Sequence, residues 1–272
     1  MLRGLIGVIH LPAMPGDPKP ITGGFAEVEK RALIDAEAWA AGGARALIVE
    51  NFGSAPFWRG DATSRIPPHQ VAAMALIVRE VASATELPVG VNCLRNDAMA
   101  ALGIAAAADL DFIRVNVHVG AYITDQGLIQ GEAADTLRYR ATLAAKVKIF
   151  ADVLVKHAAP LGPLDPGVAT EECLERGLAD GVIVTGEATG APVSKALLQQ
   201  VRQASGRAPV YIGSGLTISN AADLAPFADG AIVGTACKEQ GDVTRAVDPE
   251  RVRALVEATT KYFGDEIQGE IQ

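Results

Sequence analysis

Polar and ionisable side chains stand at or just beyond the ends of short apolar runs in this chain. Carboxylates and histidines can move protons, and arginine, lysine and amide groups can stabilise an oxyanion, so this set could form a catalytic site for a small molecule. Asp152 or Glu50 would be the general base, with His118 or His157 as its acid partner. The predicted catalytic residues are Glu50, Arg114, Asn116, His118, Asp152, Lys156 and His157, and those predicted to contact or cover the substrate are His10, Asn92, Thr185, Glu187, Trp58 and Arg59.

The spacing within the runs predicts which side chains share a face. Alternate residues of an extended chain point to the same side, so Arg114, Asn116 and His118 should line one surface, as should Asp152 and Lys156. Any one of them could instead belong to a hydrogen-bond network between strands. Several ionisable groups that converge favour a functional site, because burying charges without function costs free energy.

Two further chemistries stay open for this set. Carboxylates and histidines on separate runs could bind a divalent metal ion, but their spacing does not show that three of them converge. Lys156 could form a Schiff base with a carbonyl substrate if burial lowers its pKa. A salt bridge between Lys156 and Asp152 is the slightly favoured alternative.

The elements that must position these residues are eight runs rich in Val and Ile, typical of strands buried on both faces. They span residues 5–10, 46–51, 88–92, 111–118, 148–157, 180–186, 209–215 and 229–235. Ala-rich helical segments separate them, which predicts an α/β protein with a single (β/α)8, or TIM, barrel over residues 1–264 and a polar tail over 265–272. No G-x-G-x-x-G turn follows the first run, so there is no nicotinamide or flavin signal.

Glycine-rich turns follow the seventh and eighth runs, where this fold often binds phosphate. Backbone N–H groups of glycine turns can approach an anion closely, and the N-termini of following helices would add a favourable dipole. Tight turns also favour glycine for steric reasons alone. The predicted phosphate-binding residues are Gly213, Ser214, Gly215, Gly234 and Thr235.

Three segments on the same face are longer than ordinary connections, at residues 11–24, 52–68 and 119–131. Long loops on the active face often act as lids, so Trp58 could cover a ligand while Arg59 and Arg65 reach its anionic end. Phe57 and Trp58 could equally pack onto the barrel or onto a second subunit. Exposed loop aromatics and Ala-rich helices lead us to expect a homo-oligomer.

Composition excludes several classes of protein. The 272 residues are 49% hydrophobic and carry a net charge of −8, which argues against nucleic acid or an anionic membrane as the main partner. No stretch approaches the roughly 20 apolar residues of a membrane span. Three separated cysteines without a Cys-x-x-Cys pair are typical of a reduced cytoplasmic protein.

Motifs along the whole chain resemble those of the BtpA family, which also includes SgcQ-type proteins. They are GVIHLPAMPG, ALIVEN, FIRVNVHVGAY with the following DQG, ADVLVKHA, VTGEATG, GSGLT and GTACK before VDPERV. The resemblance implies a (β/α)8 barrel and a link to photosystem I biogenesis, but it brings no established catalytic residues. Two hypotheses follow: an isomerase, lyase or transferase acting on a small phosphorylated metabolite such as a sugar phosphate or nucleotide-like compound, or a non-catalytic assembly factor for a larger complex.

Overall fold

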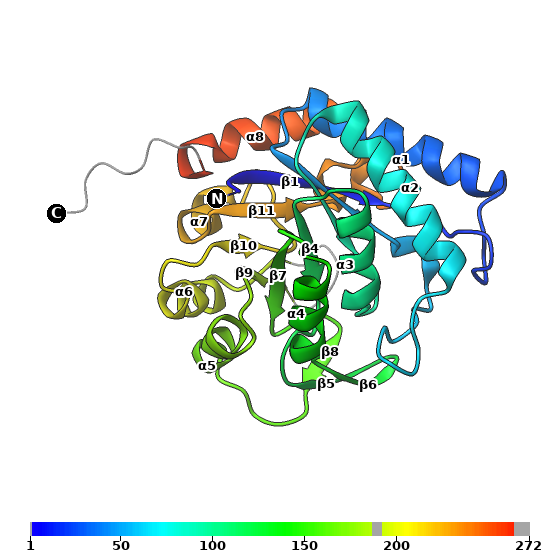
Figure 1. Cartoon of the computed structure of the whole chain (residues 1–272). Helices are drawn as coiled ribbons and strands as arrows, with labels where there is room; N and C mark the ends of the chain where they lie inside the picture. Colours follow the sequence, from blue (N-terminus) through cyan, green and yellow to red (C-terminus); the bar gives the residue numbers. More distant parts are fainter. Residues whose placement is uncertain (1, 187–191, 264–272) are drawn as a thin grey trace.

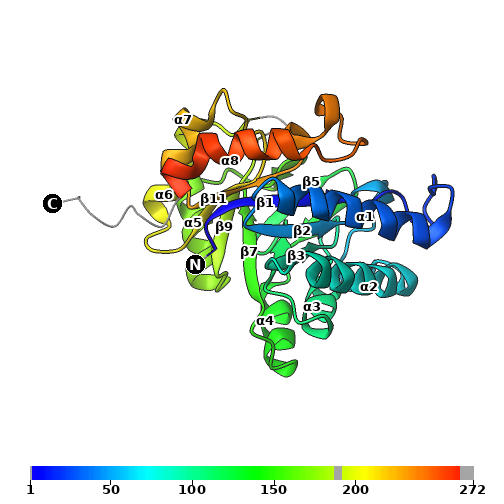
Figure 2. The same cartoon turned by 90° about the horizontal axis from the view of Figure 1, so that it is seen from above.

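The computed structural model describes residues 2–186 and 192–263. Within these ranges, eight parallel strands close into a barrel in the order β1, β11, β10, β9, β7, β4, β3, β2. They are β1 (Gly4–His10), β2 (Ala46–Glu50), β3 (Val89–Asn92), β4 (Phe112–Val115), β7 (Lys148–Val153), β9 (Gly181–Val184), β10 (Val210–Ile212) and β11 (Gly230–Val233). The helices surround the strands (Figures 1 and 2), which confirms the predicted (β/α)8 barrel.

The helices alternate with the barrel strands along the chain. The α-helices are α1 (Gly24–Ala41), α2 (Pro68–Thr85), α3 (Ala98–Ala107), α4 (Ala133–Thr142), α5 (Pro166–Glu171), α6 (Lys195–Ala204), α7 (Ala221–Leu224) and α8 (Pro249–Phe263). Short turns of other helix types are η1 (Phe52–Ser54), η2 (Glu172–Arg176), η3 (Ala225–Phe227), η4 (Thr235–Cys237) and η5 (Glu239–Gly241). None of the helices in the described ranges is long and apolar enough to cross a membrane.

The interior of the barrel is filled with apolar side chains below its polar mouth. Aromatic rings from three strands meet there, with ring centroids 5.2 Å apart for Phe112 and Phe150 and 4.8 Å apart for Phe150 and Tyr211. Gly90 makes room for this layer, because a Cβ atom there would lie 2.3 Å from the Phe112 ring. The residues two positions further along β4 and β7 also point inward, so Arg114 and Asp152 lie above the aromatic floor.

The long segment at residues 119–131 forms a β-hairpin instead of an irregular lid. Strands β5 (Ala121–Thr124) and β6 (Gly127–Gln130) pair antiparallel, and β8 (Ala158–Pro160), which follows β7, pairs with β5. Tyr122, at 5% exposure, packs with Val117, Ile129 and Val155 in a small core of its own. The three strands lie in the lower part of the view in Figure 1.

Seven of the eight predicted strands are longer than those observed, and the early ends of two of them, β4 and β7, affect the site. β4 ends at Val115, because the backbone N–H and C=O of Val117 bond to the side chain of Asn96 instead of to a neighbouring strand. β7 ends at Val153, and both Leu154 and His157 have a φ of 55°. The alternation of side chains therefore stops before His118 and Lys156, so their predicted places on a regular strand face are wrong.

Candidate functional site

A cluster of charged and amide side chains occupies the mouth of the barrel, where the carboxyl ends of the strands meet. His10 ends β1, Glu50 ends β2, and Asn92 ends β3. Arg114 and Asp152 come from β4 and β7. All except His10 are less than 9% exposed, so their polar groups must find partners within the protein.

Arg114 is the centre of the cluster. Its Nε lies 2.9 Å from Asp152 Oδ1 and its Nη2 lies 3.0 Å from Asp152 Oδ2, while its Nη1 lies 3.3 Å from Glu50 Oε1. Asn116 Nδ2 donates to Asp152 Oδ2 at 2.9 Å, and Asn92 Nδ2 donates to Glu50 Oε1 at 3.1 Å. Five predicted site residues thus form one hydrogen-bonded network.

The carboxylates and the guanidinium of this cluster stabilise each other's ionised forms. Burial alone would raise the pKa of Glu50, but Arg114, His10 and Lys156 lower it below its ordinary value. Burial acts to lower the pKa of Arg114, and its two carboxylate partners more than offset this and raise it. Glu50 and Arg114 are therefore both charged at neutral pH.

Lys156 lies at the same mouth although it follows the end of β7. Its backbone N–H donates to Thr185 Oγ1 at 3.1 Å, and its C=O accepts from Arg95 Nη2 at 2.5 Å. Burial and the neighbouring Arg114 lower the pKa of its amine. The alternative favoured for Lys156, a salt bridge with Asp152, is wrong, because Asp152 pairs with Arg114 instead.

Arg95 is a site residue that our sequence reasoning missed. It is 5% exposed, and the charged groups that act on its pKa include Asp152, Arg114 and Glu50. Burial lowers that pKa most, and a guanidinium stays protonated in proteins. The signal was available, since Arg95 stands three residues beyond Asn92 in a position just past a predicted strand end.

His10 is a partly buried residue with a neutral imidazole at this mouth. Burial lowers its pKa to about 4, against the opposing effect of Glu50. Its ring lies 4.6 Å from the ring of Phe52, and its Nδ1 is buried without a hydrogen-bond partner among the described residues. A neutral imidazole with a free ring nitrogen can donate or accept a proton.

The other two histidines predicted for the site lie outside the network. His118 Nε2 is 2.7 Å from the carbonyl oxygen of Gly177, which follows η2, so the predicted inward position of His118 is wrong. His157 is exposed, and burial and the nearby Lys156 lower its pKa.

The two glycine turns border the mouth beside β1 and β9. Gly215 has a φ of 70°, and a Cβ atom on Gly213 would lie 2.4 Å from Ile183 Cγ2. A Cβ atom on Gly234 would lie 2.4 Å from His10 Cε1. Close packing therefore requires glycine at Gly213 and Gly234 whether or not an anion binds.

No long helix starts at either turn, contrary to our expectation of helix dipoles there. The first helix after β10 is α7, which has four residues and begins at Ala221. After β11, Thr235 begins the three-residue η4, and α8 begins only at Pro249. An anion at these turns would be held by backbone N–H groups and nearby cations.

The charged cluster and the two glycine turns line one cavity of about 210 Å³. Its charged and polar lining includes His10, Glu50, Arg114 and Lys156. The segments 213–217 and 233–236 also line it, together with Val8, Ile232 and Gly241. Ser214 Oγ accepts from the backbone N–H of Gly186 at 2.9 Å, which ties the turn after β10 to the end of β9. Thr185 is buried behind Lys156.

The predicted lid residues lie farther out. Arg59 pairs with Asp61 at 3.1 Å and donates to Thr63 at 2.7 Å, so it is held within its own turn instead of reaching the cavity. Arg65 binds Asp97 and Glu132 instead of facing the mouth. Trp58 is 50% exposed. Glu187 and the tail at residues 265–272 lie outside the described residues.

The described side chains do not gather as a metal site. Within residues 2–186 and 192–263, no three His, Cys, Asp or Glu residues come together in a group that could hold a metal ion. The two carboxylates of the mouth, Glu50 and Asp152, instead bind Arg114.

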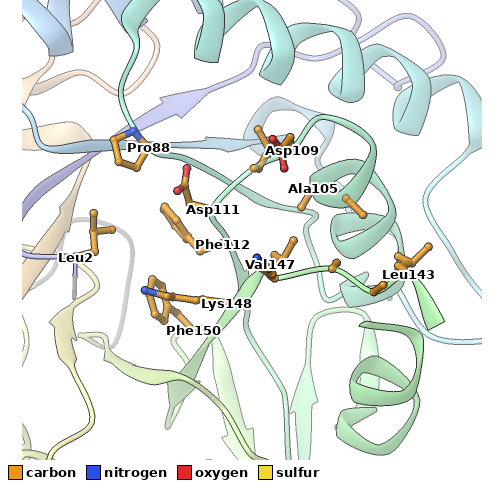
Figure 3. Close-up of a pocket in the computed structure, with 15 residues that line it drawn as sticks. Leu2, Pro88, Ala105, Asp109, Asp111, Phe112, Leu143, Val147, Lys148 and Phe150 are labelled. Atoms are coloured by element: carbon orange, nitrogen blue, oxygen red, sulfur yellow. The ribbon is translucent and has the colours of Figure 1, made fainter. Parts of the chain in front are cut away.

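A larger hollow of about 750 Å³ opens at the opposite end of the barrel. Figure 3 shows Asp111 and Lys148 beside the rings of Phe112 and Phe150 there. Phe112 and Lys148 begin β4 and β7. In (β/α)8 barrels the amino ends of the strands serve stability, while the carboxyl ends carry the active site. The smaller cavity at the mouth is therefore the candidate site.

Comparison with known proteins gives relatives along the whole chain. A photosystem I biogenesis protein, BtpA, from Synechocystis is 46% identical over 254 residues, which are 93% of this chain and 87% of the relative. An uncharacterized protein from Thermococcus kodakarensis is 43% identical over 94% of both chains. The structure of orotidine 5'-phosphate decarboxylase from Pyrococcus horikoshii is similar in fold, with a TM-score of 0.58 at 16% identity over 93% of this chain and 99% of that one. The BtpA family profile matches residues 1–261, and the chain belongs to the BtpA family.

Proposed function

We propose that this protein is an enzyme that acts on a small phosphorylated metabolite, a sugar phosphate or nucleotide-like compound, by isomerisation, lyase or transferase chemistry. The observation that carries the proposal is the cavity itself. One cavity of about 210 Å³ is lined by the two glycine turns together with an acid, a guanidinium and an amine. A substrate whose phosphate rests on the turns would present its other end to Glu50, Arg114 and Lys156.

Charge at the mouth supports an anionic ligand. The protein as a whole carries a net charge of −8, yet the mouth holds Arg95, Arg114 and Lys156 against the carboxylates Glu50 and Asp152. Backbone N–H groups of the turns add donors of fixed direction without adding charge. An acidic protein can hold a phosphate group locally in this way.

The partners of the two carboxylates favour different roles for them. Both oxygens of Asp152 accept hydrogen bonds from Arg114, so Asp152 orients the guanidinium. Glu50 lines the cavity and is the better candidate for the general base. Arg114 would stabilise developing negative charge on the substrate, and His10 could carry a proton as a neutral imidazole.

The alternative function, a non-catalytic assembly factor, rests on the name of the Synechocystis relative. A pure assembly role does not require buried ionisable groups around a cavity, because each buried charge costs free energy unless it is paired. The cavity therefore favours the enzyme. The likeness to orotidine 5'-phosphate decarboxylase concerns the fold, so it does not carry the proposal.

Calorimetric titration with glycerol 3-phosphate tests the proposal, with glycerol as the matched ligand that lacks the phosphate. We expect binding of the first and none of the second, and a crystal soaked in glycerol 3-phosphate should show the phosphate at residues 213–215 and 234–236. The variant Arg114→Met should weaken binding. Absence of binding, or a phosphate bound elsewhere on the surface, would contradict the proposed site.

A further inference from the structure

We propose that Lys156 is a nucleophile that forms an imine with a carbonyl carbon of the phosphorylated substrate. The proposal rests on the proposed function, because the same cavity must bind the substrate's phosphate. It narrows the substrate class to aldehydes or ketones that carry a phosphate group.

The backbone of Lys156 is fixed so that its side chain faces the cavity. Thr185 Oγ1 accepts its N–H, and Arg95 donates to its C=O. β7 and β1 are opposite each other in the closed barrel, four strands apart in either direction. Lys156 nevertheless lines the same cavity as His10 of β1 and interacts electrostatically with it, so its side chain extends over the mouth.

The amine of Lys156 forms no salt bridge with Asp152, the carboxylate four residues earlier in the chain. Asp152 uses both oxygens on Arg114 and one of them also on Asn116. Among the described residues, no carboxylate oxygen lies within 4.0 Å of Lys156 Nζ in a salt bridge. A partly buried lysine whose only role was its positive charge would be expected to pair with a carboxylate.

The surroundings shift the amine of Lys156 toward its neutral, reactive form. Burial and the guanidinium of Arg114 lower its pKa, and Arg95 acts in the same direction. Glu50 and Asp152 oppose them. Desolvation and a neighbouring cation are the two ways in which proteins activate a lysine for imine formation. His10 is neutral and does not add a further positive charge.

The chemical step balances without any additional reagent. Glu50 takes a proton from the ammonium group of Lys156, and the nitrogen lone pair attacks the carbonyl carbon to form a C–N bond. A proton then passes from nitrogen to the former carbonyl oxygen. The C–O bond breaks, the proton held by Glu50 joins the leaving hydroxyl, and water departs from a protonated imine. This cation withdraws electrons from the adjacent carbon, as isomerisation and aldol-type cleavage require.

Borohydride trapping tests the proposal with glyceraldehyde 3-phosphate as the probe. Sodium borohydride reduces an imine to a stable secondary amine, which intact-protein mass spectrometry detects and peptide mapping assigns to a residue. Glycerol 3-phosphate, which has the phosphate but no carbonyl group, is the matched control. We expect an adduct on Lys156 with the first compound and none with the second.

Two lysine variants show whether the adduct forms specifically on Lys156 or on lysines in general. Lys156→Arg keeps the positive charge and should abolish the adduct while still binding glycerol 3-phosphate. Lys148→Arg changes an exposed lysine at the start of β7, at the opposite end of the barrel, and should leave the adduct unchanged. An adduct that persists in Lys156→Arg, or maps mainly to other lysines, would overturn the proposal.

The outcomes also distinguish this proposal from the proposed function. Binding of glycerol 3-phosphate without trapping of glyceraldehyde 3-phosphate would reject the imine and leave a phosphate-binding enzyme that acts through Glu50 and Arg114. Failure to bind glycerol 3-phosphate and to form the adduct would reject both. Competition by glycerol 3-phosphate against trapping would tie the amine and the phosphate turns to one site.

Discussion

Arg114 and Asp152 form a two-pronged ion pair inside the barrel, with Nε–Oδ1 at 2.9 Å and Nη2–Oδ2 at 3.0 Å. The exposed fraction of the side chain is 3% for Arg114 and 0% for Asp152. The parallel geometry fixes the plane of the guanidinium, which leaves Nη1 directed at Glu50. Asp152 therefore acts on the cavity through the orientation of Arg114.

The variant Asp152→Asn should destabilise the protein as well as impair ligand binding. It leaves Arg114 buried with only Glu50 as a charged partner, and breaking a buried ion pair on one side typically costs about 3 to 5 kcal/mol. Urea unfolding measures the loss. Asp223→Asn is the control, because Asp223 pairs with Lys195 at 3.7 Å on the surface and should lose less than about 1 kcal/mol.

A double variant, Arg114→Met with Asp152→Asn, checks the reason for this loss. It should be more stable than the sum of the two single changes predicts, since neither charge is then left alone. Additive losses would mean that the two side chains do not stabilise each other. Unchanged stability in Asp152→Asn would mean that solvent reaches Arg114.

The sequence predicted the closed barrel and much of the cluster because both follow from regular strands. Glu50, Arg114 and Asp152 lie within or at the end of strands, where alternation decides the face of each side chain. The same rule failed for His118, because Asn96 captures the backbone of Val117 and ends the regular pairing. Such a side-chain contact across strands leaves no periodic signal in the sequence.

Two other features were missed for different reasons. The hairpin of β5 and β6 joins Thr124 to Gly127 through a two-residue turn, and the turn residues Asp125 and Gln126 precede a glycine, which is a recognisable hairpin signal. Arg95 was missed because it lies three residues beyond the end of its run, where alternation no longer predicts the direction of a side chain. The partner of Asp152 could not be derived, since a sequence does not tell which of two cations approaches a carboxylate.

The variant Gly234→Ala should disturb the mouth of the barrel. A Cβ atom would lie 2.4 Å from His10 Cε1, so the ring or the turn must move, and overpacking of this kind costs about 1 to 3 kcal/mol. We expect a lower melting temperature and weaker binding of glycerol 3-phosphate. Gly162→Ala is the control, because its Cβ would meet nothing within 4 Å. Equal effects of the two variants would contradict the close packing.

The chain is predicted to form a homo-oligomer. Trp58 is 50% exposed and Leu76 is 66% exposed, and a second subunit could cover such side chains. Light scattering at micromolar concentration gives the mass in solution, and Trp58→Ser and Leu76→Ser should each reduce association if that side chain lies in the contact. A monomeric mass for the unchanged protein would reject the prediction.

His10 should make the protein less stable in mild acid. Its pKa is about 4 in the folded protein and 6.5 in an ordinary environment, so the unfolded chain binds a proton at this residue before the folded one does. The free energy of unfolding should therefore fall as the pH drops from about 6.5 to about 4, by about 3 kcal/mol from this group. Urea unfolding at a series of pH values measures the slope.

The variant His10→Asn should flatten that slope, because the group that titrates is gone. Some dependence should remain, since His118 and His157 also have lowered pKa values and act in the same direction. His69→Asn changes an exposed histidine and should keep the full slope. If His10→Asn keeps it too, the imidazole of His10 takes up its proton as readily in the folded protein as in the unfolded chain, and its role as a neutral proton carrier in the cavity must be abandoned.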